Sequence, residues 1–106
     1  MPKYLFEVNY VGDGVKGLLK DGGTGRRAVA EKLFSSVGAR IEGWYYAFGD
    51  VDLYVIADVP DHATAASIAL NVSAAGTAKA RTIVLLTQEE ADAAGKKSPV
   101  YTPPGR

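Results

Sequence analysis

Alternating apolar and polar side chains mark the first predicted strand of this chain. In residues 3–10 every second side chain is large and apolar, which is the period of a strand with one buried face. Three more strands are predicted at residues 40–48, 51–58 and 78–87. Gly49 and Asp50 separate the second strand from the third. They predict a tight two-residue hairpin, because glycine supplies the positive φ that such turns require.

Helical spacing of apolar residues predicts two longer helices between these strands. In residues 25–37 an apolar side chain recurs at every fourth position, which gives the helix one apolar stripe. Thr24 is placed to cap its start and Gly38 to end it. The second helix is predicted to begin after a capping Asp61 and to stop at Gly76.

Shorter elements complete the pattern. Residues 15–20 have room for one or two helical turns between glycines, and Thr87 is placed to cap a final helix over residues 88–94. Prolines recur in residues 96–106, so we expect an extended tail there after a domain of residues 1–95. Tyr101 is the one large aromatic anchor in that tail, which we expect to lie along a neighbouring surface.

The order of elements is β-α-β-β-α-β, which predicts an α+β ferredoxin-like fold. In this fold two helices cover one face of an antiparallel sheet, and the other face is bare in the monomer. The adjacent residues Trp44, Tyr45 and Tyr46 cannot all enter one core, because successive side chains of a strand point to opposite faces. We therefore expect a second copy of the chain to cover the bare face as a homodimer, with further assembly into hexamers left open.

Composition narrows the classes of function. Twelve basic residues balance twelve acidic ones and the pI is near 6.6, so no strong attraction to nucleic acid or to an anionic membrane is expected. The absence of cysteine excludes disulfides and thiolate catalysis. No apolar run approaches the length of a membrane span, and the expected location is the cytoplasm.

Five stretches of the chain occur in a recognisable combination: Tyr4-Leu5, residues 17–20 with 22–27, residues 45–52, residues 85–87 with 89–90, and residues 101–105. With them the chain resembles the GYD family of small bacterial proteins over nearly its whole length. At one position Val51 stands where the family's name points to a tyrosine. The resemblance implies a ferredoxin-like fold of the dimeric α/β-barrel kind and no particular activity. Relatives by fold include small monooxygenases, lactone isomerases, haem enzymes and ligand-binding regulators.

A glycine-rich segment follows the first strand, and its spacing Gly12-x-Gly14-x-x-Gly17 matches the dinucleotide-binding fingerprint. That fingerprint also needs a long helix directly after the glycines and a parallel βαβ unit. Here Gly22 and Gly23 interrupt the helix. We therefore interpret the segment as a loop that links strand to helix.

Two arginines follow the second group of glycines and suggest an anion site. Arg26 and Arg27 come directly after Gly25, in the predicted first turn of a helix, where the helix dipole disfavours positive charge. One interpretation is that an anion or a partner's carboxylate binds Gly25, Arg26 and Arg27. The other is that both side chains extend into solvent.

The bare sheet face is the second candidate site. Glu7, Asn9 and Tyr54 share this face and come from strands that are neighbours in the predicted fold. Further members expected there are Trp44 and Tyr46, or else Tyr45, and Lys79 or Arg81. Polar groups that converge in an aromatic cavity are typical of a small-ligand pocket. Burial would prepare Glu7 as a general base, whereas pairing with a lysine or arginine of the other subunit would make it part of an interface.

Metal and cofactor chemistry find little support in the sequence. His62 is the sole histidine and lies beside the capping Asp61. Asp50 has a role in a turn and Asp58 at a strand end, so among the aspartates of residues 50–61 only Asp52 has no local role. We therefore predict no metal site and no cofactor.

Three functions remain open at this point. The first is an oligomer that binds a small hydrophobic or anionic ligand between paired sheets. The second is a cofactor-independent isomerase or oxygenase with Glu7 as its base. The third is a structural homo-oligomeric protein whose sheet face is filled by side chains.

Overall fold

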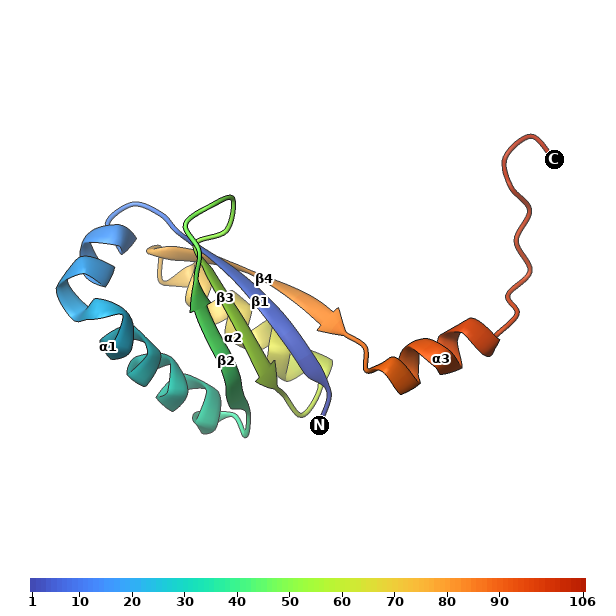
Figure 1. Ribbon diagram of the computed structural model, residues 1–106. Coiled ribbons are helices and arrows are strands. Elements are labelled where there is room, and N and C mark those ends of the chain that lie inside the picture. The colour runs from blue at the N-terminus through green and yellow to red at the C-terminus, as the bar shows by residue number, and fades with distance from the viewer.

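The computed structural model describes residues 1–106 and has the predicted α+β architecture. The elements are β1 (Lys3–Tyr10), α1 (Gly14–Ser36), β2 (Arg40–Tyr46), β3 (Leu53–Asp58), α2 (His62–Ala74), β4 (Ala78–Leu85) and α3 (Gln88–Lys96). The four strands form one antiparallel sheet in the order β2-β3-β1-β4. This order confirms the ferredoxin-like arrangement (Figure 1).

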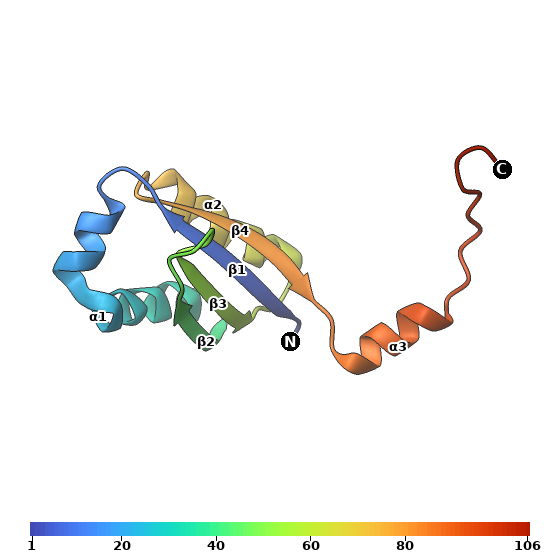
Figure 2. The ribbon, with the colours of Figure 1, turned by 45° about the horizontal axis from the view of Figure 1, so that its top comes forward.

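The core lies between one face of the sheet and the helices α1 and α2, which we call the covered face (Figure 2). Side chains at alternate positions of β1 enter it, with Tyr4 and Phe6 only 1% and 2% exposed. Phe34 of α1 packs edge-to-face on Phe6, with ring centroids 5.4 Å apart. The opposite face, which we call the open face, carries no helix in either view.

The helix α1 is longer than predicted, because the short helix and the main helix join across a kink. Gly22 has φ 76° and ψ 161°, which is not helical, while the residues around it continue the helix. Thr24 therefore lies after the kink, and no side-chain hydrogen bond of Thr24 caps a helix start there. Gly38 ends α1 as predicted: its φ is 77°, and the following Ala39 N–H donates to the Phe34 carbonyl.

The prediction of a two-residue hairpin at Gly49 and Asp50 is wrong. The strand β2 ends at Tyr46 and β3 begins at Leu53, so a six-residue loop, residues 47–52, connects them. The Ala47 N–H donates to the Asp52 carbonyl across the base of this loop, at 2.9 Å. The side chain of Val51 in this loop is buried, with 4% of its surface exposed. This burial favours a wide loop over a tight turn.

The glycine segment after β1 has a packing role. Gly12 has φ 55°, a conformation that glycine adopts readily. A Cβ on Gly14 would lie 2.0 Å from the Thr77 carbonyl oxygen, so only glycine fits where the start of α1 meets the chain before β4. This close approach explains the first two glycines of the fingerprint without a nucleotide.

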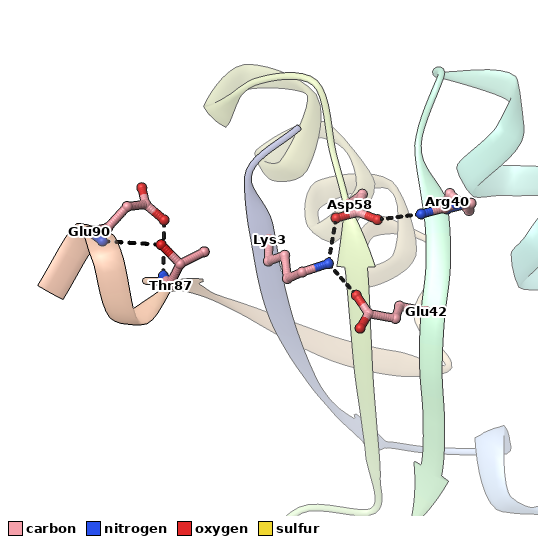
Figure 3. Close-up of polar contacts among 6 residues, drawn as sticks. All are labelled: Lys3, Arg40, Glu42, Asp58, Thr87 and Glu90. Carbon is pink, nitrogen blue, oxygen red and sulfur yellow. Dashed lines mark hydrogen bonds and ion pairs between the residues drawn. The ribbon is translucent and has the colours of Figure 1, made fainter.

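Both later helices begin at the predicted caps. The Asp61 carboxylate accepts from the Thr64 N–H at 2.7 Å at the start of α2. Thr87 and Glu90 form a reciprocal capping box at the start of α3 (Figure 3). The strand before α3 ends at Leu85, two residues earlier than predicted.

The last residues leave the body of the molecule. The C-terminal arm, Leu86–Arg106, projects from the end of β4 with α3 and an irregular tail (Figures 1 and 2). No residue of α3 is buried. The radius of gyration is 16.7 Å, against about 13 Å for a compact chain of this length. None of the helices has the length and apolar content to cross a lipid bilayer.

Candidate functional site

An apolar cavity lies between the covered face and the helices; we call it the helix–sheet cavity. Its volume is about 100 Å³. All but one of its lining residues are hydrophobic, and they come from α1, α2 and all four strands. The central ones are Phe6, Phe34, Trp44, Val55 and Ile68, and the charged exception is Arg26. An apolar cavity of this order of size accepts one small ring, since a cavity of about 150 Å³ is known to bind benzene.

Trp44, which lines this cavity, carries a buried polar group without a partner. The indole Nε1 is buried and has no hydrogen-bond acceptor. An indole N–H only donates, and leaving a buried donor unpaired costs about 1–3 kcal/mol. An acceptor atom on a bound molecule would relieve this cost.

The expected placement of Trp44 and Tyr46 on the open face is wrong. Trp44 pairs with Val55 and Tyr46 with Leu53, and both aromatic rings pack against the core on the covered face. The reason is a β-bulge between Ile41 and Gly43, which inserts one residue into β2 and reverses the alternation after it. Tyr45, the alternative that the sequence left open, points to the open face and is 65% exposed.

Polar groups gather where the cavity approaches the surface between α1 and α2. Arg26 and Tyr10 line the helix–sheet cavity and also an outer groove of about 480 Å³, which we call the mouth groove. Burial raises the pKa of the Tyr10 phenol to about 12, and the nearby Tyr46 hydroxyl adds to the rise. Tyr10 is therefore a neutral hydrogen-bonding group at physiological pH.

The kink in α1 is held by the aromatic cluster of β2. The Tyr46 hydroxyl donates to the Gly23 carbonyl at 3.1 Å. A Cβ on Gly23 would lie 2.9 Å from the Tyr46 ring, so a side chain there would press on the ring. Phe48 stacks on the other side of Tyr46, with ring centroids 5.7 Å apart. These contacts fix the start of the helical segment that carries Arg26.

The two arginines of the predicted anion site have separate surroundings. Arg26 lies 3.3 Å from Asp21 and lines the cavity, whereas Arg27 lies 2.9 Å from Glu31 and does not. Each has a carboxylate nearby, so the positive charges are compensated within α1. Gly25 lies in the same helix and has no side chain that could bind an anion. The geometry therefore separates Arg26 from the other two predicted members of the site.

The open face is organised in cross-strand rows. Leu5 lies between Ile56 and Ile83 on the neighbouring strands, which makes an apolar row. The next row places Glu7 between Tyr54 and Arg81, as the sequence predicted. The Glu7 carboxylate accepts a hydrogen bond from Arg81 at 2.9 Å, so its charge has a cationic partner in the same subunit.

Asn9 has a structural role at the end of β1. Its side-chain oxygen accepts from the Asp52 N–H, and the Asp52 carboxylate accepts from the Tyr10 N–H, both at 2.9 Å. These bonds tie β1 to the loop between β2 and β3. The side-chain oxygen of Asn9, which the sequence predicted to contact a ligand, therefore holds that loop in place.

Charged side chains close the other end of the open face (Figure 3). Asp58 accepts from Lys3 at 2.9 Å and from Arg40 at 3.1 Å, and Lys3 also bonds Glu42. The Lys3 ammonium, followed by the Arg40 guanidinium, holds the pKa of the Asp58 carboxyl below its ordinary value. This network joins β1, β2 and β3.

Comparison with known protein families matches the GYD domain over residues 4–94. The chain belongs to the GYD domain family. No match was found among curated proteins or among solved structures. The GYD match spans β1 from Tyr4 onward, the other three strands and all of α1 and α2, so it includes the helix–sheet cavity. Val51, at the position where the family's name points to a tyrosine, is buried in the loop after β2.

Sequence reasoning missed the role of two residues in this GYD domain. Tyr10 was predicted only as a strand residue. Arg26 was predicted as part of an anion site with Gly25 and Arg27, and not as a residue that lines a cavity beneath the helices. A signal was present for Arg26, because it lies three residues before Val29 and seven before Leu33 and so shares their helical face. For Tyr10 the signal was the alternation of the first strand, which places Tyr10 on the same face as Phe6 and Val8.

Proposed function

We propose that this GYD domain protein binds a small, mostly apolar carboxylate in the helix–sheet cavity. The observation that carries the proposal is the buried Trp44 Nε1, which lacks an acceptor in the wall of an otherwise apolar cavity. A carboxylate oxygen would accept this hydrogen bond, and the apolar part of the ligand would contact Phe6, Val55 and Ile68.

Arg26 supports an anionic ligand over a neutral one. It is the only charged residue in the cavity wall, and its side chain is 37% exposed and thus reaches between cavity and solvent. Its distance of 3.3 Å to Asp21 is long for a charge-assisted hydrogen bond. A ligand carboxylate would therefore compete with Asp21 for the guanidinium. The neutral Tyr10 phenol lies at the same end of the cavity as a further donor.

The proposed site lies on the opposite side of the sheet from the one predicted between paired sheets. The catalytic alternative used Glu7 as a base, and it required a carboxylate without a cationic partner. Arg81 supplies that partner within the subunit. The pairing favours a binding protein over an isomerase or oxygenase that uses Glu7.

Trp44 is the only tryptophan, so its fluorescence reports on the cavity directly. We expect saturable changes in this signal on titration with benzoate and with its neutral analogue toluene. Arg26→Gln should weaken benzoate about tenfold, which corresponds to about 1.4 kcal/mol, and should leave toluene binding nearly unchanged. Arg27→Gln is the matched control, because Arg27 has the same charge and does not line the cavity.

Two outcomes would contradict the proposal. One is the absence of a saturable fluorescence change with either compound. The other is an equal loss of benzoate binding in Arg26→Gln and Arg27→Gln, which would show that only the general positive charge of α1 matters.

We also propose that a second copy of the chain covers the open face. The apolar row of Leu5, Ile56 and Ile83 crosses the sheet without a helix above it. The charges beside it are already paired within the subunit, as Glu7 with Arg81, so an identical face can approach without unpaired charge. A two-fold interface of this kind is the commonest form of assembly.

A further inference from the structure

We propose that the C-terminal arm of one copy packs into a groove between α2 and β4 of a second copy. The groove, which we call the α2–β4 groove, has a volume of about 470 Å³. It is lined mainly by apolar side chains: Tyr4, Ala65, Ala66, Ala69, Leu70 and Val84, with His62 and Thr82 as polar members. This inference concerns a surface remote from the helix–sheet cavity and does not rest on the proposed ligand.

The helix α2 lacks the charged outer surface of an ordinary surface helix. Residues 62–74 contain no lysine, arginine, aspartate or glutamate. Leu70 is 69% exposed on its outer side, and Val84 of the adjoining strand is 51% exposed. A surface helix normally carries charged and polar side chains opposite its apolar stripe, whereas here exposed alanines and Leu70 lie among the few polar ones. The outer side of α2 therefore has the composition of an interface.

The tail of the arm has matching chemistry. Residues 98–104 carry no charge, whereas Lys96 and Lys97 before them and Arg106 after them do. Val100 and Tyr101 are 101% and 74% exposed, so the largest apolar side chains of the tail are left mostly uncovered by their own subunit. Three prolines in the tail limit its conformations in the free state, which lowers the entropy cost of docking an extended segment.

The direction of the arm favours a second copy as the owner of the groove. The capping box at Thr87 fixes the start of α3, and α3 carries the tail away from its own sheet (Figures 1 and 2). The nine residues of α3 alone span about 13 Å. In a two-fold pair each arm reaches the other subunit and each groove is filled once, so the exchange closes on itself.

The absence of cysteine allows a direct test in the full-length chain. Ala66→Cys places one thiol in the groove, and Thr102→Cys places one in the tail beside the intact Val100 and Tyr101. Each variant is purified separately, and the two are mixed and oxidised. A disulfide between them can only join two different molecules. We expect at least about tenfold more of this mixed disulfide than from Lys16→Cys with Thr102→Cys, because Lys16 is exposed on α1, as Ala66 is on α2, and lies outside the groove.

A second variant tests whether Tyr101 directs the contact. Adding Tyr101→Ser to Thr102→Cys should reduce the mixed disulfide with Ala66→Cys to the level of the Lys16 control. Equal yields for Ala66→Cys and Lys16→Cys would overturn the proposal. The double variant Ala66→Cys with Thr102→Cys provides a second way to overturn it. If this variant forms its disulfide within a monomer at all concentrations, and the mixture of single variants forms none, the arm packs on its own subunit.

Discussion

The two faces of the sheet differ although the same strands build both. Along β1 the residues Tyr4, Phe6 and Val8 are at most 8% exposed on the covered face, while the alternate residues Leu5 and Glu7 are only half-buried on the open face. The covered face holds the core and the helix–sheet cavity. The open face holds an apolar row beside paired charges. The fold of one subunit thus depends mainly on the covered face, and the open face is free to serve assembly.

Adjacent residues of β1 offer the sharpest test of this difference. Phe6→Ala should destabilise the protein by about 3–5 kcal/mol, because it removes a buried ring and leaves a cavity in the core. Leu5→Ala should cost less than about 1.5 kcal/mol, since Leu5 keeps contact with solvent. Urea unfolding of both variants at the same protein concentration measures the two losses. Equal losses would show that the open face contributes as much to the fold as the core does.

Asp58 tests whether the charged end of the open face also supports the fold. Asp58→Asn should cost about 1–2 kcal/mol at pH 7, because it weakens two charge-assisted hydrogen bonds to an aspartate whose side chain is 9% exposed. The lowered pKa of the Asp58 carboxyl sets the pH dependence. Its contribution is fully present above the unfolded pKa near 3.8 and is lost as the pH falls through the lower, folded value.

The stability difference between wild type and Asp58→Asn should therefore be constant from pH 7 to about 5 and should shrink below pH 4. Unfolding curves recorded across this range measure it. Glu42→Gln is the control, because Glu42 bonds Lys3 from a half-exposed position and should cause a smaller loss. A difference that persists unchanged at pH 2 would mean that the carboxylate charge has no part in the effect.

Ile83 tests assembly and not folding. Ile83→Asp places a charge in the apolar row of the open face and should weaken self-association about tenfold or more. Its effect on folding should be small, since Ile83 is 39% exposed. Leu19→Asp is the matched control on α1, where the side chain is 80% exposed. Analytical ultracentrifugation over a concentration series measures the association. A wild-type chain that stays monomeric at high concentration would contradict the proposed pairing.

The sequence predicted the order of elements well, because periodicity and caps act locally. Two helices begin after Asp61 and Thr87, because the side chains of these residues cap the first turn. The helix α1 ends before Gly38, because glycine readily adopts the positive φ needed there. The wide loop after β2 was not predictable, because it depends on the burial of Val51 in the folded chain. The same holds for the kink in α1, which joins two predicted helices across Gly22.

The candidate site was predictable only in part. The position of Glu7 on the open face, near Lys79 or Arg81, followed from strand order and alternation. Its ion pair with Arg81 of the same subunit did not follow, because the sequence suggested a partner across a subunit interface. The orientation of Trp44 did not follow, because strict alternation from Ile41 puts its ring on the wrong face. A cavity is a property of how helices and strands fit together, so no local pattern reveals that Trp44 and Arg26 share one.

The bulge in β2 has a consequence for relatives of this chain. A homologue that lacks one residue near Glu42 would keep the letters of the Trp-Tyr-Tyr motif and turn each ring to the other side of the sheet. The middle tyrosine would then enter the interior, and the tryptophan would reach solvent. Insertions and deletions at this point would therefore divide such homologues into two groups with different interiors, even where the motif itself is identical.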